Sequence, residues 1–498
     1  MKIYKSILYC AIVGLLFSSC SDWLDVQPET ESKEEDLFTE YRGFKSALTG
    51  CYMAMANDDA YGKRLTMTNI ESLACVWYFE SEPYSSDAEA ANYYLNAHDY
   101  NDVARDAVQT IYSKMYNIIV QLNKIIRNAE NNPGAFPNEK TQAVILGEAY
   151  ALRAYCHLDI LRLFGEVPNG TGEKVNLPYS EVAAFDERPE YCDFATYSEK
   201  LIADLTKAEE LLKDNDPIFE YTFEDLNMPA YLELDDTYMG YRQSRMNYWA
   251  VKALQARAYL YLGKTTEAYQ AAMAVINGKD ANGEPVMSLS GSTDRSDGYK
   301  ACPNECLFYL SKPDIKSVAE VLIGGADIEY SNSYLCTLPE RIDEMFPENR
   351  ADDNRYGTMM WNKQVDDGYG YFYAATLKYY FSDDAEEKTL YYNIVPMLRM
   401  SEVYLIAIET TSDLAEANRL YAEYMLQGCN VGLLEDAFDA GSDRSEMLIA
   451  EYRREFIAEG QLFYTYKRNQ VKDMLWCDEE MTDDDYVLWN CVNTEFNP

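Results

Sequence analysis

The segment GEAYALRAYCHLDILRLFGEVP, residues 147–168, predicts a long buried helix. Its apolar residues fall on more than one face, so packing partners are expected on several sides. Gly147, Ala151 and Ala154 recur at i, i+4 and i+7, a stripe of small residues that lets another helix approach closely. Gly165 is expected to end the helix as a left-handed cap, and the proline three residues later cannot continue it. We therefore expect this helix to be the central strut of the fold.

Helical periodicity extends from this strut in both directions along the chain. Asn131-Asn132-Pro133-Gly134 ends the preceding helix and turns the chain back, which predicts a helix-turn-helix unit with the central helix. The other predicted helices cover residues 38–55, 104–129, 194–212, 396–408, 414–426 and 445–458.

Residues 247–276 carry a tetratricopeptide-like pattern. Gly263 lies between two predicted helices, and the small residues Ala256 and Ala268 allow the helices to nest. The predicted fold class is therefore mainly α, with tetratricopeptide-like helix pairs that form a scaffold.

Two segments lack the helical period and are rich in aromatic residues. Most of residues 69–96 is predicted to be loop, and residues 278–392 an irregular insertion on the scaffold, with short β-like runs such as 320–323. Loops on a rigid scaffold commonly carry binding residues. The aromatic residues of these segments include Trp77, Tyr78, Tyr84, Trp361, Tyr369, Tyr371 and Tyr373.

The composition is strongly acidic. Lys and Arg number 43 against 84 Asp and Glu, which gives a formal net charge of −41. Such a chain repels phosphate, so nucleic acid is not an expected partner and polyanionic ligands are disfavoured. The 44 tyrosines are the most unusual feature, because tyrosine combines an apolar face with a polar tip suited to wet binding surfaces. Most of them are nevertheless expected to pack between helices.

Residues 1–20 predict a secretory signal. Lys2 and Lys5 precede an apolar run over residues 7–17 that is too short to span a membrane. Ser18-Ser19-Cys20 resembles a bacterial lipobox, in which Cys20 would become the lipidated first residue of the mature protein. An ordinary signal peptide cut elsewhere is the alternative. The acidic residues that follow are similar to the tags that send Bacteroidetes lipoproteins to the cell surface.

No metal site, cofactor or catalytic residue is expected, although acidic runs such as Asp483-Asp484-Asp485, interpreted as a solvated surface, would permit a structural calcium. Of the 12 cysteines, ten lie beyond Cys20 without a regular framework, and only Cys302 and Cys306 form a close pair. The chain has two histidines, His98 and His157, and no second cysteine pair at ligand spacing. His157 lies in the central helix and is expected to be a core residue, and most of the ten cysteines are expected to be buried free thiols.

Several motifs resemble the SusD/RagB family of surface lipoproteins. They are Leu-Arg-Ala-Tyr at 152–155, Leu-Phe-Gly-Glu-Val-Pro at 163–168, Leu-Arg-Met-Ser-Glu-Val-Tyr-Leu at 398–405, Glu-Tyr-Arg-Arg-Glu-Phe at 451–456 and Glu-Gly at 459–460. Where relatives commonly have Asp-Leu-x-Arg, residues 464–468 read Tyr-Thr-Tyr-Lys-Arg. The resemblance implies a SusD-like helical fold with an irregular, loop-rich ligand-facing part, in which residues 21–230 and 231–498 form two halves of one compact unit.

The resemblance also implies a function. Family members are lipid-anchored in the outer membrane, capture nutrients at the cell surface and pass them to a SusC-like TonB-dependent β-barrel transporter. The ligand is most often a glycan and sometimes a peptide. The ligand-contacting aromatics of the family correspond here to Trp77, Tyr78, Tyr84 and Trp361.

Two alternatives to glycan capture remain open. A tyrosine-rich cleft also suits a peptide, and 84 carboxylates offer many acid/base pairs for an all-helical glycosidase. The sequence contains no nucleophile elbow, zinc motif or glycine-rich phosphate loop, which favours a binding protein over an enzyme.

Overall fold

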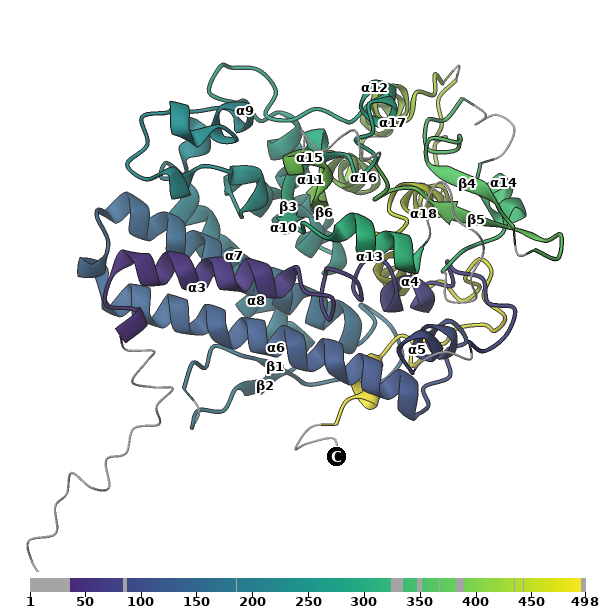
Figure 1. Cartoon of the computed structure of the whole chain (residues 1–498), viewed down its shortest axis with the longest axis horizontal. Helices are drawn as coiled ribbons and strands as arrows, with labels where there is room; N and C mark the ends of the chain where they lie inside the picture. Colours follow the sequence, from purple (N-terminus) through teal and green to yellow (C-terminus); the bar gives the residue numbers. More distant parts are fainter. Residues whose placement is uncertain are drawn as a thin grey trace, which may run out of the picture.

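A computed structural model describes residues 36–83, 87–184, 186–323, 335–346, 352–366, 368–381, 389–433, 435–441 and 443–493. The predicted signal segment with Cys20, and Tyr84, lie outside these ranges. Helices dominate the described chain, so the predicted fold class, mainly α with paired helices, is confirmed (Figure 1). No helix among the described residues is long and apolar enough to cross a membrane.

Four helices form the first half of the scaffold. They run side by side in the left half of Figure 1 and are α3 (Tyr41–Met55), α6 (Asp102–Asn131), α7 (Glu139–Phe164) and α8 (Phe194–Leu212). Side chains cap three of them, because Asn101, Asn138 and Asp193 accept hydrogen bonds from backbone N–H groups in the first turns of α6, α7 and α8. The predicted helices of this half are thus confirmed.

Helix α7 is the predicted central strut and is buried along most of its length. A Cβ added at Gly147 would lie 2.7 Å from Leu212 Cγ of α8, so the stripe of small residues does permit close helix packing. The predicted left-handed cap at Gly165 is wrong, because its φ of −73° and ψ of 170° are extended. Glycine is required there for a steric reason, since a Cβ would lie 2.5 Å from the Leu161 carbonyl oxygen.

The second half of the scaffold contains the tetratricopeptide-like pair, α10 (Tyr248–Tyr261) and α11 (Thr265–Ile276). Gly263, with a φ of +71°, makes the turn between them, as the sequence predicts. The later helices are α16 (Met400–Thr410), α17 (Leu414–Cys429), α18 (Ser445–Glu455) and α19 (Leu462–Arg468). One hydrophobic core runs from Phe38 to Val492 and includes residues of both halves.

Three sequence predictions of secondary structure are wrong. Residues 69–96 contain α4 (Asn69–Leu73) and α5 (Asp87–Asn96) instead of being mostly loop. Residues 320–322 belong to α13 (Ile315–Leu322), whose buried residues recur at helical spacing, and Ile323 is the C-cap of this helix. Residues 396–399 belong to strand β6 (Ile394–Arg399), which pairs antiparallel with β3 (Cys306–Ser311). Strand β6 is buried throughout, and a short continuous apolar run does not distinguish a strand from a helix.

The remaining elements are short. They are β1 (Leu177–Tyr179), β2 (Glu190–Cys192), β4 (Trp361–Asp366), β5 (Phe372–Thr376), α9 (Phe223–Leu226), α12 (Ser292–Ser296), α14 (Pro339–Met345) and α15 (Thr389–Tyr392).

His157 is a satisfied core residue, as predicted. Its Nδ1 lies 2.7 Å from the Tyr197 hydroxyl and its Nε2 lies 3.3 Å from the Ser180 carbonyl oxygen. Burial, with a smaller contribution from the Arg153 charge, lowers the pKa of His157 to about 3, so the ring is neutral at physiological pH. The ten described cysteines are free, and all but Cys477 are buried, which confirms that most are buried thiols.

Helix α7 carries charged side chains into the core, and one of them, Glu148, binds several partners there. Its carboxylate, fully buried, accepts from Arg242 and Arg245, and it also accepts from the Tyr52 hydroxyl at 2.7 Å. Arg242 in turn donates two hydrogen bonds of 2.9 Å to Asp216. These ion pairs tie α3 and α7 to the segment before α10.

Glu148→Gln should therefore destabilise the protein strongly. The substitution leaves two buried guanidinium groups with one charged partner fewer, which costs about 3 to 5 kcal/mol of unfolding free energy. Urea denaturation monitored by circular dichroism measures this loss.

The matched control is Glu220→Gln, which removes the carboxylate of an exposed pair with Lys140. An exposed pair contributes about 0 to 1 kcal/mol. Equal, small losses in the two variants would contradict a stabilising role for the buried network.

Candidate functional site

The two tryptophans predicted to bind ligand lie in the interior. Trp77 is 0% exposed and donates its indole N–H to the Met67 carbonyl at 2.9 Å. Trp361 is 4% exposed and donates to the Arg355 carbonyl at 3.0 Å. Neither ring has an exposed face on which a ligand could stack. The burial of Trp77 and Trp361 therefore contradicts the prediction that they bind the ligand. Both indoles are satisfied core residues.

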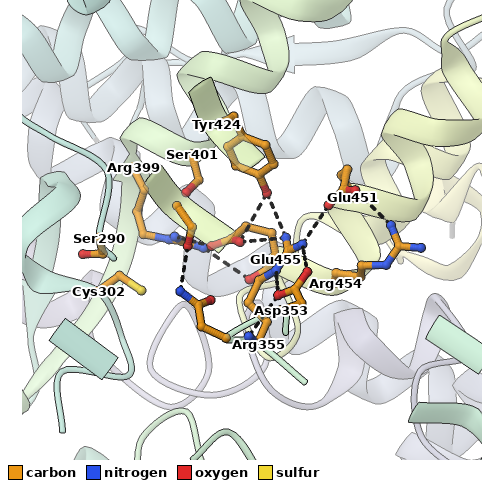
Figure 2. A network of polar contacts seen from close by, with 12 residues as sticks. Ser290, Cys302, Asp353, Arg355, Arg399, Ser401, Tyr424, Glu451, Arg454 and Glu455 are labelled. Atoms are coloured by element: carbon orange, nitrogen blue, oxygen red, sulfur yellow. Dashed lines mark hydrogen bonds and ion pairs between the residues drawn. The ribbon is translucent and has the colours of Figure 1, made fainter. Parts of the chain in front are cut away.

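Trp361 is held in place by a buried network of charges (Figure 2). Arg355 donates to Asp353 at 2.7 Å, to Glu451 at 3.0 Å and to Glu455 at 3.1 Å. Arg399 approaches Glu455 from the other side at 2.8 Å. The network fixes the segment that leads into β4 against helix α18.

The carboxylates of this network are held in ion pairs with arginine. Burial alone would raise the pKa of Glu455, but the Arg399 and Arg355 guanidinium groups hold it well below its usual range. A carboxylate so tightly ion-paired is a poor proton donor or acceptor. Figure 2 also shows Cys302 and Ser290 at the edge of the same cluster.

Among the predicted site residues that the structure describes, Tyr78 lines a large cleft, whereas Trp361 borders only a small cavity of about 20 Å³. We call the large cleft the aromatic cleft. It has a volume of about 770 Å³ and is lined by Tyr78, Glu80, Glu340, Lys363, Gln364, Tyr371 and Phe372, among others. The strands β4 and β5, which project at the right edge of Figure 1, supply one wall, and the segment leading into α14 supplies another.

Backbone hydrogen bonds join these walls. The Tyr78 N–H donates to the Cys336 carbonyl at 2.8 Å, and Thr337 and Ala374 exchange two bonds of 3.0 and 2.8 Å. Beneath them, Val365 and Tyr373 form a small core cluster of their own, against which Tyr78 packs. The cleft is therefore built on paired backbone rather than on independent loops.

Exposed aromatic rings line the rim of the cleft. Tyr371 is 71% exposed and Phe372 is 50% exposed, whereas Tyr373 points into the small core cluster and is 5% exposed. Tyr371 and Phe372 belong to the run Tyr-Gly-Tyr-Phe, in which Gly370 has a φ of +97°. An exposed aromatic ring beside a flexible glycine is the local signal that identifies this rim.

Arg341 extends the aromatic surface beyond the cleft. Its guanidinium carbon lies 5.3 Å from the centre of the Tyr78 ring and 5.1 Å from that of Trp476, so it bridges the two rings. Trp476 is itself half-buried and donates its indole N–H to Glu344 at 2.8 Å. The sequence analysis predicted a binding role for neither Arg341 nor Trp476. Trp476 in particular is far from the cleft segments along the chain.

A second cleft of about 670 Å³ lies near α3 and is lined by Lys45, Tyr52, Met53, Tyr238, Tyr241 and Arg245, among others. Its charged groups already have partners in the fold. Arg245 is bound to Glu148 and stacks on the Tyr238 ring at 3.8 Å, and Lys45 is paired with Asp236. The aromatic cleft is the stronger candidate, because its exposed rings are not held between such buried ion pairs.

The comparisons with known proteins agree with this fold. A family model described as SusD-like, starch-binding and associating with the outer membrane matches residues 22–225. SusD-like protein P25 of Formosa agariphila is 25% identical over 170 residues, which are 34% of this chain and 31% of that protein. The chain thus aligns with about a third of the length of this curated relative.

Solved structures share the fold over most of the chain. A SusD superfamily protein from Bacteroides thetaiotaomicron has a TM-score of 0.66 at 18% identity and covers 89% of this chain and 94% of its own. Surface glycan-binding protein A from Bacteroides uniformis has a TM-score of 0.65 at 15% identity, with coverage of 89% and 94%. The comparisons therefore show that residues 22–225 match the SusD-like family model and that the chain as a whole shares the helical fold of these solved structures.

Proposed function

We propose that this chain is a surface lipoprotein that captures a neutral oligosaccharide in the aromatic cleft and delivers it to a TonB-dependent outer-membrane transporter. The observation that carries the proposal is the pair of exposed rings, Tyr371 and Phe372, which lie beside Tyr78 in a cleft of about 770 Å³. The family description as starch-binding and the glycan-binding name of a structural relative support the ligand class.

The chemistry of the cleft suits a sugar. Sugar rings present C–H faces that stack on aromatic side chains, and their hydroxyls bond to nearby carboxylates, amides and ammonium groups. Glu80 and Gln364 supply such groups beside the rings, and Lys363, which is paired with Asp343 at 2.7 Å, also lines the cleft. The net charge of −41 disfavours acidic polysaccharides, so a neutral glycan is the proposed ligand.

The proposed protein binds its ligand without cleaving it. The buried carboxylates around Glu455 are ion-paired in the core, away from the exposed rim of the cleft. Recovery of the intact oligosaccharide after prolonged incubation distinguishes capture from glycosidase activity. Retention of peptides instead of glycans would identify the peptide-binding alternative.

Tyr371→Ala should weaken glycan binding while leaving the fold intact. Neutral oligosaccharides from starch, β-glucan and mannan are first screened on an array, and the best binder is used for calorimetric titration. Loss of a stacking ring should cost about 1 to 3 kcal/mol of binding free energy. The melting temperature should stay nearly unchanged, because the ring is mostly exposed.

The matched control is Tyr369→Ala. Tyr369 is 90% exposed, two residues away, and is not among the residues that line the cleft. It should bind as the parent does. If Tyr371→Ala and the parent bind every retained oligosaccharide equally well, the aromatic cleft is not the binding site.

Anchoring and delivery are proposed from the lipobox-like Ser18-Ser19-Cys20 and from the family description. Cys20→Ala should move the protein from the membrane fraction to the soluble fraction, because stable attachment requires acyl chains. Pull-down of the parent after gentle solubilisation should recover a much larger β-barrel protein. Equal membrane partitioning of the two chains would contradict lipidation, and repeated recovery of the lipoprotein alone would contradict the partner.

A further inference from the structure

Three potential metal ligands converge beside the aromatic cleft. The Sγ atoms of Cys75 and Cys477 and a ring nitrogen of His98 all lie within 4.8 Å of one another. Cys75 follows α4, His98 follows α5, and Cys477 comes after α19. The fold thus brings together residues that are as much as 402 positions apart, since 477 minus 75 is 402.

The hydrogen bonding of His98 leaves one nitrogen suited to a metal. Its Nε2 lies 3.0 Å from the Leu73 carbonyl oxygen. A carbonyl oxygen only accepts, so Nε2 must carry the proton and the neutral ring keeps a lone pair on Nδ1. Nδ1 faces Cys477 Sγ at 3.6 Å. A carbonyl that fixes the tautomer of a histidine in this way is the usual outer-shell partner of a metal ligand.

The spacing also fits a tetrahedral ion. Zinc binds sulfur at about 2.3 Å and nitrogen at about 2.0 Å, so two such ligands on one tetrahedral ion lie about 3.5 Å apart. The observed separation of His98 Nδ1 and Cys477 Sγ is 3.6 Å.

The backbone at two of the three residues is also unusual. Cys75 has a φ of 55° and His98 a φ of 50°, both in the left-handed region that non-glycine residues avoid. Such conformations persist where the surrounding structure enforces them, and they concentrate at ligand sites.

We propose that Cys75, His98 and Cys477 form a zinc site in which the fourth coordination position is open to water. Two thiolates and an imidazole select a thiophilic ion such as Zn²⁺ over Ca²⁺ or Mg²⁺, and binding releases the two thiol protons to solvent. Cys477 and His98 are partly exposed, so an ion has access to the site. The absence of a local ligand motif explains why the sequence led to the expectation of no metal.

A second cluster of potential ligands among the described residues does not qualify. Cys302, Glu305 and Glu455 also lie within 4.8 Å of one another. Both carboxylates, however, are ion-paired with Arg399 in the core, and the positive charge of that guanidinium opposes a cation.

The zinc site would stabilise the aromatic cleft. Cys75 lies three residues before Tyr78, and Cys477 directly follows Trp476, the ring that faces the same Arg341 guanidinium as Tyr78. An ion held by Cys75 and Cys477 would join the two segments that carry these rings. Zinc binding itself can be measured without any glycan, so its failure and that of the proposed function are distinguishable.

The test is a zinc titration of the full chain. The protein is reduced, stripped with a chelator and titrated with Zn²⁺ against a chromophoric competitor. The parent should bind one zinc ion per chain, and Co²⁺ in its place should give a sulfur-to-cobalt charge-transfer band. Cys477→Ser and His98→Gln should each weaken binding by about 100-fold or more, because even outer-shell changes cost about 10- to 100-fold.

His98→Gln serves as a second ligand variant because the glutamine amide can still donate to the Leu73 carbonyl. The matched control is Cys192→Ser, which alters a buried free cysteine in β2 outside the cluster and should leave zinc affinity unchanged. Zinc should raise the melting temperature of the parent and of Cys192→Ser only.

Three outcomes would overturn the proposal. The first is that the reduced parent binds no stoichiometric zinc. The second is that Cys477→Ser and His98→Gln bind zinc as tightly as the parent. The third is that thiol titration of protein purified without reductant shows a disulfide between Cys75 and Cys477.

Discussion

Helix α7 is buried on nearly every side and still carries Glu148, Arg153, Asp159 and Arg162, all of them buried. A buried charge without a partner costs several kcal/mol, so each of these charges needs a partner within the fold. Glu148 is paired with Arg242 from the segment before α10, and Arg153 with Asp204 of α8. Asp159 and Arg162 pair with each other within α7, and Asp159 also accepts a hydrogen bond from Tyr61. Helix α7 can pack in the core only where these charges are satisfied, so the scaffold depends on ion pairs as well as on apolar contact.

The helical part of this scaffold could be predicted because its signals are local. Apolar spacing, the glycine at the α10–α11 turn and the small residues of α7 lie within single elements. The buried ions could not be predicted, since a charged residue in a sequence usually indicates an exposed face. Several residues in the motifs that resemble the SusD/RagB family prove to be such ions. Arg399 binds Glu305, Glu455 and Glu459, and Glu402 binds Arg257.

The candidate site likewise contains residues that a local sequence pattern predicts and residues that no local pattern predicts. Tyr78 could be predicted as a binding residue because it lies in a segment of aromatic residues among polar ones. The same pattern, however, also predicted Trp77, which is in the core. The difference depends on the Met67 carbonyl that satisfies the Trp77 indole, and on the pairing of Thr337 with Ala374 that places the β4–β5 rim beside Tyr78. Contacts of this kind join distant segments, and no local pattern specifies them. The cluster of Cys75, His98 and Cys477 escaped notice for the same reason.

The central claim is that a rigid helical scaffold presents the aromatic cleft to a neutral oligosaccharide. Hydrogen–deuterium exchange of the full chain, with and without the best-binding oligosaccharide of the array, tests it most directly. The account predicts slower exchange on binding in residues 76–80, 335–341, 361–366 and 368–376, which contain the residues that line the cleft, and unchanged exchange around Lys45 and Tyr238 in the second cleft. Protection confined to the second cleft, or no protection in the aromatic cleft at saturating ligand, would contradict the account.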